Sequence, residues 1–242
     1  MDKLRNYLSD LKTNYNAVGL KAEFETEGAS FEDVYRLRKI SQEIGLYLSV
    51  KIGGCGDIRS LIETKEIKAD TIVAPMIESP YAMEKFVKSF YNIYKNEDSL
   101  PKLYINIETI CAFENIHKIF QDKCMEYIHG IVIGRGDLAE SLKIDVNDNK
   151  VSDITNQLIL ITQKYNKKLI IGGKISPDNI LNIPQQQISG IETRKVIFEP
   201  PVKKEGIIKA LEFEIEWLKN KNDKNIFDKK RLEELSKRIL NA

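Results

Sequence analysis

The stretch from residue 103 to residue 142 contains two short apolar runs, LYINIETI (residues 103–110) and GIVIGRGDLAESL (residues 130–142). Glu108 closes the first run, and Asp137 follows the second after a glycine-rich turn. A parallel α/β barrel builds its active site from strands that deliver acids at their C-terminal ends. Two such acids on adjacent strands predict a seat for Mg²⁺ or Mn²⁺, because these hard cations prefer oxygen ligands.

Outward from this stretch, β-like runs alternate with helical patterns, which predicts βαβ units and a parallel sheet. Seven or eight such units in 242 residues favour a closed TIM (β/α)₈ barrel over an open sheet. The glycine-rich turn that an open dinucleotide-binding sheet needs, GxGxxG, is absent. The β-like runs lie at residues 18–25, 46–52, 71–74, 103–108, 130–134, 168–172 and 188–198, and the last has room for two strands. The helical patterns lie near residues 31–44, 55–67, 80–95, 111–124, 150–165 and 177–182.

The C-terminal end of the chain has a different pattern. We expect a barrel domain over residues 1–219 and a helical extension over residues 220–242, because the polar segment KNKNDKN (residues 219–225) separates them. The last helix, predicted at residues 229–240, carries an apolar stripe of Leu232, Leu235, Ile239 and Leu240. That stripe packs either on its own barrel or on a neighbouring subunit. We expect the second arrangement, in a homo-oligomer.

Composition excludes several classes of partner. The 37 basic residues are balanced by 36 acidic ones, so no basic excess attracts nucleic acid or an anionic membrane. No apolar run reaches the roughly 18 residues that cross a bilayer, and the N-terminus MDKLRNYLSDLK lacks the apolar core of a signal peptide. Three widely spaced cysteines (Cys55, Cys111 and Cys124) indicate free thiols in a reducing compartment. These features predict a cytoplasmic protein.

Charged residues also end the first two β-like runs. Glu23, Glu25 and Glu27 alternate at the end of the first run and would share one side of a strand that stays extended. Lys51 closes the second run and is followed by Gly53 and Gly54, where backbone can approach a ligand closely. We take Glu23, Glu25 and Lys51 as candidate catalytic residues. The alternatives are a solvated acidic loop and a purely structural ion pair.

Further candidates point to binding of an anion. The turn Gly134-Arg135-Gly136 exposes backbone N–H groups at the start of a helix, which is a natural cradle for a carboxylate or phosphate. Lys174 and Arg194 follow later runs and are candidate ligands of the same substrate groups, unless they are ordinary surface charges. The tripeptide Ile-Glu-Thr occurs at residues 62–64, 107–109 and 191–193, so that tripeptide alone is weak evidence.

Three segments together resemble the HpcH/HpaI aldolase and citrate lyase β-subunit family. They are KADTIVAPMIESPYAMEKF (residues 68–86), INIETICAFENI (residues 105–116) and GIVIGRGDLAESL (residues 130–142), and the resemblance spans roughly residues 18–198. It implies a phosphoenolpyruvate/pyruvate-type barrel that binds Mg²⁺ or Mn²⁺ through Glu108 and Asp137. It further implies that the backbone N–H groups of Gly136 and Asp137 hold the carboxylate of the substrate.

The chain departs from that family at two positions. Glu23 and Glu25 resemble the family's acidic pair, but Thr26 stands where aldolase members have a histidine. Lys51 stands in place of an arginine, and a lysine lacks the bidentate fork. The histidines of the chain, His117 and His129, lie mid-helix and just before a strand, so we expect structural roles for both.

The combined pattern predicts a metal-dependent carbon–carbon lyase or aldolase that acts on a small pyruvate-like 2-oxo acid through a stabilised enolate. One alternative is an acyl-CoA lyase of the citrate lyase β type. Others are a different reaction on the same metal–enolate chemistry and a non-catalytic ligand-binding barrel that retains the metal pair. The changed positions at Thr26 and Lys51 favour the last of these, whereas the acids and Lys51 at the strand ends oppose it.

Overall fold

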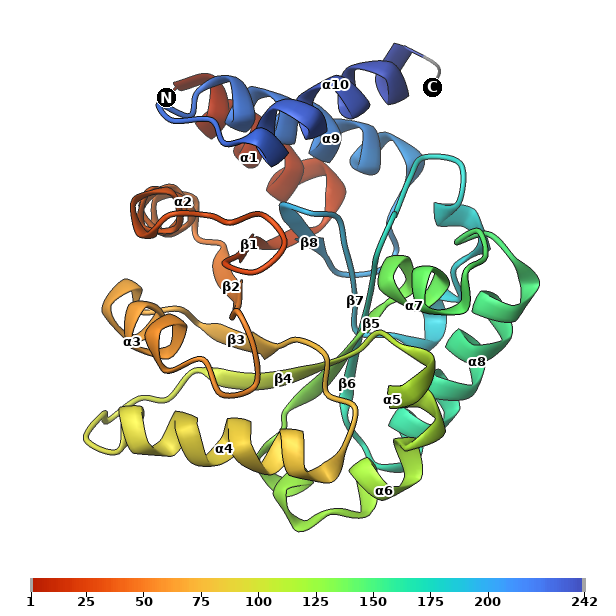
Figure 1. Cartoon of the computed structure of the whole chain (residues 1–242). Coiled ribbons are helices and arrows are strands. Elements are labelled where there is room, and N and C mark those ends of the chain that lie inside the picture. The colour runs from red at the N-terminus through yellow and green to blue at the C-terminus, as the bar shows by residue number, and fades with distance from the viewer. Residues whose placement is uncertain (1, 241–242) are drawn as a thin grey trace.

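The computed structural model describes the backbone of residues 2–240 and the side chains as far as residue 235. In this part of the chain, eight strands close into a barrel in sequence order, which confirms the predicted TIM-barrel fold (Figure 1). Strands β1 to β7 run parallel to one another. Their bounds are β1 (Ala17–Glu23), β2 (Tyr47–Lys51), β3 (Thr71–Ala74), β4 (Lys102–Ile107), β5 (Gly130–Gly134), β6 (Lys168–Gly172), β7 (Gly190–Glu192) and β8 (Val196–Phe198).

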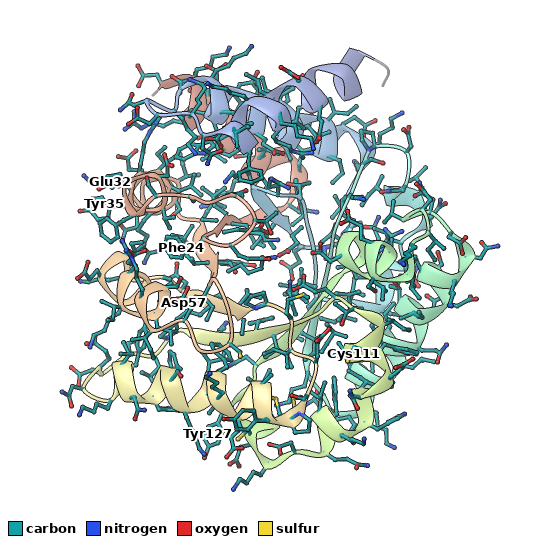
Figure 2. The ribbon with its side chains drawn as sticks, in the orientation of Figure 1. Phe24, Glu32, Tyr35, Asp57, Cys111 and Tyr127 are labelled. Atoms are coloured by element: carbon teal, nitrogen blue, oxygen red, sulfur yellow. The ribbon has the colours of Figure 1, made fainter. Side chains whose placement is uncertain are left out.

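Helices surround the barrel, and capping side chains start four of them at the C-terminal ends of strands. Ser30, Asp57, Ser79 and Thr109 each accept the backbone N–H three residues further on, which satisfies a donor that the helix leaves free. Asp57 is labelled in Figure 2. The helices are α1 (Asp2–Tyr15), α2 (Phe31–Ile44), α3 (Ile58–Ile67), α4 (Pro80–Tyr94), α5 (Ile110–Glu114), α6 (Ile116–Gln121), α7 (Arg135–Leu142), α8 (Asn149–Lys164), α9 (Lys204–Lys219) and α10 (Ile226–Leu240).

The twofold period of the strands divides the barrel interior into layers. At the N-terminal end, the rings of Tyr47 and Tyr104 fill space beside Gly19 and Gly130. Val73, Tyr104, Val132 and Ile170 form a small apolar cluster of their own, separate from the main core. Toward the C-terminal end the same alternation brings charged side chains inward, and these line the cavity described below.

Strand β8 departs from the regular barrel pattern because it runs antiparallel to both neighbours, β7 and β1. Thr193 closes a tight turn between β7 and β8: its backbone N–H donates to Val196 O at 2.9 Å, and its hydroxyl accepts from the N–H of Val196 at 3.1 Å. No helix therefore connects these two strands. The sequence left room for two strands in residues 188–198, but it did not predict that the second strand runs antiparallel. The connecting residues 193–195, TRK, contain neither the Gly nor the Asn of a common hairpin turn.

The reversal of β8 decides where the C-terminus goes. After β8 the chain is at the N-terminal end of the barrel, where the N–H of Glu199 donates to Asn16 O. Helix α9 then packs along α1 and ends beside α2, where Arg36 donates to Asn220 O at 2.8 Å. Helix α10 follows at the C-terminal end of the barrel and packs on α9 (Figure 1).

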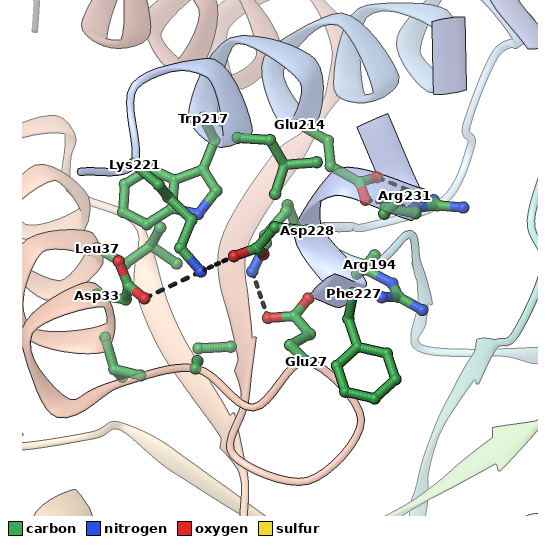
Figure 3. Close-up of a pocket in the computed structure, with 15 residues that line it drawn as sticks. Glu27, Asp33, Leu37, Arg194, Glu214, Trp217, Lys221, Phe227, Asp228 and Arg231 are labelled. Carbon is green, nitrogen blue, oxygen red and sulfur yellow. Dashed lines mark hydrogen bonds and ion pairs between the residues drawn. The ribbon is translucent and has the colours of Figure 1, made fainter. Parts of the chain in front are cut away.

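The extension packs on its own barrel in the described residues. Leu235 is fully buried, and Leu232 packs against the main core. Lys221 binds Asp33 on α2 and Asp228 on α10, at 3.0 and 2.7 Å (Figure 3). The side chains of Ile239 and Leu240 lie outside the described residues. The apolar stripe that suggested a subunit interface is thus buried against the same chain as far as Leu235. Self-association stays a prediction.

Of the helices that the structure describes, none is long and apolar enough to span a membrane.

The close packing of Gly130 against Tyr104 predicts the effect of a single added methyl group. A Cβ at Gly130 would lie 2.2 Å from Tyr104 Cε1 and 2.8 Å from the backbone oxygen of Lys168. We expect Gly130→Ala to lower the free energy of unfolding by roughly 1–3 kcal/mol in urea denaturation. Gly54→Ala is the matched control, because no atom lies within 4 Å of a Cβ there. Equal stability of the two variants would contradict this packing.

Candidate active site

A cavity of about 500 Å³ opens at the C-terminal end of the barrel. It is the place where a barrel of this type carries its chemistry. Residues predicted from the sequence contribute much of its wall: Glu23, Lys51, Glu108, Gly134, Gly136, Asp137, Lys174 and Arg194. The structure therefore brings together side chains from strands that lie far apart in the sequence.

Glu108 is buried directly after β4, and its carboxylate is held on both sides. Oε1 accepts the backbone N–H of Met76 at 2.9 Å, and Oε2 accepts the side-chain amide of Asn106 at 2.6 Å. Burial raises the pKa of Glu108 to about 7; the charge of Lys51 opposes this rise, and the like charge of Asp137 adds to it. The two predicted metal ligands are thus close enough to repel each other.

Asp137 is exposed in the first turn of α7, in the same cavity. Within the described side chains, no three His, Cys, Asp or Glu residues gather into a metal cluster. The oxygen donors available beside Glu108 and Asp137 include Asn106 Oδ1, which is buried and has no hydrogen-bond partner in the described part of the chain. Carboxylate and amide oxygens with room for water suit a hard divalent cation.

The turn before α7 leaves an open space beside backbone amides. Gly173 has φ +84°, and a Cβ there would lie 2.3 Å from the nitrogen of Gly136 and 2.6 Å from that of Arg135. A glycine at position 173 therefore keeps this space free at the N-terminus of α7, where the helix dipole favours an anion. The Arg135 side chain itself does not line the cavity. It is buried and donates to Val146 O at 3.1 Å, so Arg135 contributes to this turn through its backbone N–H, and its part in substrate binding stays a prediction.

The three acids at the end of the first predicted run do not share a strand face, because β1 ends at Glu23 and the chain then turns. Each acid has its own lysine. Glu23 lies 2.7 Å from Lys21, Glu25 lies 2.8 Å from Lys51, and Glu27 pairs with Lys195 in the hairpin turn. For the buried carboxylates of Glu23 and Glu27, the cost of burial is offset by pairing within the barrel.

Charge pairing fixes the protonation of two candidate catalytic residues. Burial alone would raise the pKa of Glu23, but Lys21 and Lys51 outweigh burial and lower the pKa to about 2. Burial alone would lower the pKa of Lys51, but Glu23 and Glu108 outweigh it and hold the pKa above its ordinary value. Lys51 is therefore a buried cation and Glu23 a permanent anion, and neither exchanges protons at neutral pH. Glu25 is exposed and does not itself line the cavity, but it contacts the lining residue Lys51.

Sequence reasoning missed Lys21 and Glu192. Lys21 donates to Glu192 at the end of β7, and both line the cavity. Two signals were available: Lys21 precedes Glu23 by two residues in an alternating strand, and Glu192 closes an apolar run in the third Ile-Glu-Thr. Arg231 and Glu234 also line the cavity, from α10. No local pattern indicates that a C-terminal helix reaches the mouth of the barrel.

The remaining candidates lie where their strands end. Lys174 is exposed and pairs with Glu140 at 2.9 Å, and Arg194 lies in the β7–β8 turn.

His117 and His129 do not line the cavity; His129 Nδ1 accepts the N–H of Leu103 at 3.2 Å, before the strands begin. All three cysteines are free thiols, with Cys111 exposed (Figure 2).

Comparison with known proteins supports the resemblance seen in the motifs. Residues 55–170 match the family model described as HpcH/HpaI aldolase/citrate lyase, which confirms that resemblance. The fold is similar to that of an HpcH/HpaI aldolase from Desulfitobacterium hafniense DCB-2, with TM-score 0.63, 13% identity, and coverage of 80% of this chain and 82% of that one. Citrate synthase SbnG gives TM-score 0.62, 17% identity, and coverage of 78% and 81%. The comparison with curated proteins finds no match.

The buried position of Glu108 predicts a pH-dependent loss of stability. Its folded-state pKa of about 7 lies above the ordinary 4.5, so the folded state holds the proton more tightly than the unfolded state. Between these values, rising pH destabilises the metal-free wild type, by up to about 3 kcal/mol in full. Glu108→Gln cannot titrate, so its stability relative to wild type should rise from pH 5 to pH 8.

Urea unfolding in EDTA at both pH values measures this difference. The exposed Glu114→Gln is the control. A stability difference between Glu108→Gln and wild type that stays constant with pH would contradict the prediction.

Proposed function

From the relation of this chain to the HpcH/HpaI aldolase/citrate lyase family, we propose that it is a metal-dependent carbon–carbon lyase or aldolase acting on a pyruvate-like 2-oxo acid. One observation carries the proposal. The acids Glu108 and Asp137, the open amide cradle before α7 and the buried cation Lys51 meet in one cavity. These are the groups that a 2-oxo acid needs: a seat for a cation, a site for its carboxylate, and a positive charge beside its oxygen.

Mg²⁺ or Mn²⁺ fits the donor set. Glu108 and Asp137 are the ligands we propose, and the unpartnered Asn106 Oδ1 offers a third oxygen nearby. The raised pKa of Glu108 fits as well, because a cation between two carboxylates relieves their repulsion. When bound, the cation supplies Lewis-acid polarisation of the 2-oxo group.

In the proposed cleavage of a 4-hydroxy-2-oxo acid, each group of the cavity has a separate role. The amides of Gly136 and Asp137 bind the carboxylate, and Lys51 stabilises negative charge as it develops on the substrate oxygen. Glu25 takes the proton of the C4 hydroxyl. The C3–C4 bond then breaks, an aldehyde is released, and the electron pair of the broken bond moves to C3. Protonation at C3 completes the 2-oxo acid product. Glu23 remains ionised and holds Lys21 and Lys51 in place.

Metal binding tests the proposed ligands directly. We expect calorimetry to detect one Mg²⁺ or Mn²⁺ site in the wild type and an affinity at least tenfold lower in Asp137→Asn, because an amide cannot replace the charge of a carboxylate ligand. Asp153→Asn is the control, since Asp153 is an exposed aspartate on α8. Equal affinity in the wild type and Asp137→Asn would overturn the assignment.

Exchange of the C3 protons of pyruvate in D₂O tests the chemistry without knowledge of the second product. The metal-loaded wild type should exchange them. Lys51→Ala should slow exchange by about 100-fold or more, the usual cost of losing an oxyanion donor, and Lys51→Arg should restore part of the rate. Lys118→Ala, an exposed lysine on α6, is the control. Binding of pyruvate without exchange would instead favour the non-catalytic barrel.

A further inference from the structure

We propose that the N-terminal end of the barrel holds a second binding site, which takes a small neutral molecule with several hydroxyl groups. The site is a cavity of about 170 Å³, the lower chamber, at the end of the barrel opposite the candidate active site. It does not depend on the chemistry proposed for the C-terminal end. The side chains of its inner wall come from β2, β3, β4 and β6: Tyr47, Ser49, Thr71, Val73, Tyr104 and Ile170.

Strand alternation explains why a chamber forms at this level. Every second residue of β2 faces inward, so Tyr47 and Ser49 line the lower chamber and Lys51 lines the upper cavity. On the neighbouring strand β1, Gly19 has no side chain, and the ring of Tyr47 lies only 2.6 Å from the place of a Cβ there. Because Ser49 and Thr71 are also small, the side chains leave this level of the barrel partly empty.

Four hydroxyl groups face this space without a hydrogen-bond partner in the part of the chain whose side chains are described. They belong to Tyr47, Ser49, Thr71 and Tyr104, and the last three residues are more than nine-tenths buried. Buried polar groups in proteins nearly always have a partner, because an unpaired one is costly. Several unpaired hydroxyls around one space therefore indicate that something from outside the chain satisfies them.

The chemistry of the wall selects a neutral partner. Burial raises the pKa of Tyr47 and of Tyr104, so both phenols stay protonated and uncharged. The two charged residues of the chamber lie at its outer part, where Asp70 is bound by Arg38 and Lys102 is exposed to solvent. Inside the chamber, hydroxyls that can each donate and accept match the hydroxyl groups of a ligand.

The apolar part of the wall favours a carbon skeleton over water alone. Val73 and Ile170 offer no hydrogen bond, so water beside them would lack partners, whereas the C–H groups of a ligand would pack against them. A cavity of about 150 Å³ is large enough for a molecule of the size of benzene. The lower chamber thus suits a polyol of four carbons or a sugar of five.

Two alcohols with four carbons test the proposal by NMR titration of isotope-labelled protein. Erythritol has a hydroxyl on every carbon, whereas butan-1-ol has a single one. We expect erythritol to shift the backbone amide signals of Ser49, Thr71 and Tyr104. Its dissociation constant at these signals should be at least about tenfold lower than that of butan-1-ol, because each additional hydrogen bond contributes a factor of about 2 to 10.

Variants that remove one hydroxyl locate the site. Tyr104→Phe and Thr71→Val nearly keep the shape of their side chains. Because the lost hydroxyls have no partner in the protein, both variants should match or exceed the wild-type stability in urea. They should bind erythritol about 3- to 10-fold more weakly. Tyr81→Phe, which changes an exposed tyrosine on α4, is the control and should alter neither quantity.

Three results would overturn the proposal. One is the absence of shifts at the chamber signals with erythritol, and another is equal affinity for the two alcohols. The third is an unchanged affinity for erythritol in both Tyr104→Phe and Thr71→Val, because binding would then lie elsewhere. None of these measurements involves turnover or the metal, so the proposed function stands or falls separately.

Discussion

Buried lysine–carboxylate pairing is the constraint on which the rest of this structure depends. Alternation along β1, β2 and β4 turns Lys21, Glu23, Lys51 and Glu108 into the barrel, where an unpaired charge is costly. Each lysine lies within ion-pair distance of two acids: Lys21 of Glu23 and Glu192, and Lys51 of Glu25 and Glu108. The pairs fix the side chains in place before any ligand arrives, which is the preorganisation that electrostatic catalysis requires.

The same pairing separates the roles of the acids. Glu23 is held ionised by two lysines, whereas Glu108, farther from its lysine and close to Asp137, has a pKa raised to about 7. Position within one small cavity thus gives similar carboxylates different chemistry. A divalent cation at Glu108 and Asp137 would neutralise the negative charge of these two carboxylates, which is why we place the proposed metal there.

The reversed strand β8 links the fold to the shape of the mouth. A parallel β8 would begin at the N-terminal end of the barrel and need a crossover from β7. The antiparallel β8 needs only the turn at residues 193–195. The chain leaves β8 at the N-terminal end of the barrel, and α9 runs along α1 and brings α10 to the end that holds the cavity. Arg194, Arg231 and Glu234 all reach the cavity through this one change of direction.

The sequence alone determined the local elements: three strands, at 71–74, 130–134 and 168–172, agree with their predicted bounds, and the acids at 108 and 137 lie where their runs end. Such features follow from periodicity and strand ends, which are properties of neighbouring residues. Tertiary structure alone decided which lysine pairs with which acid, that the side chain of Arg135 lies away from the cavity, that β8 reverses, and that the last helix packs on its own barrel as far as Leu235. Each of these outcomes depends on contacts between segments far apart in the chain, as in Lys21 with Glu192 or Arg231 with Glu214, and no local pattern records such contacts.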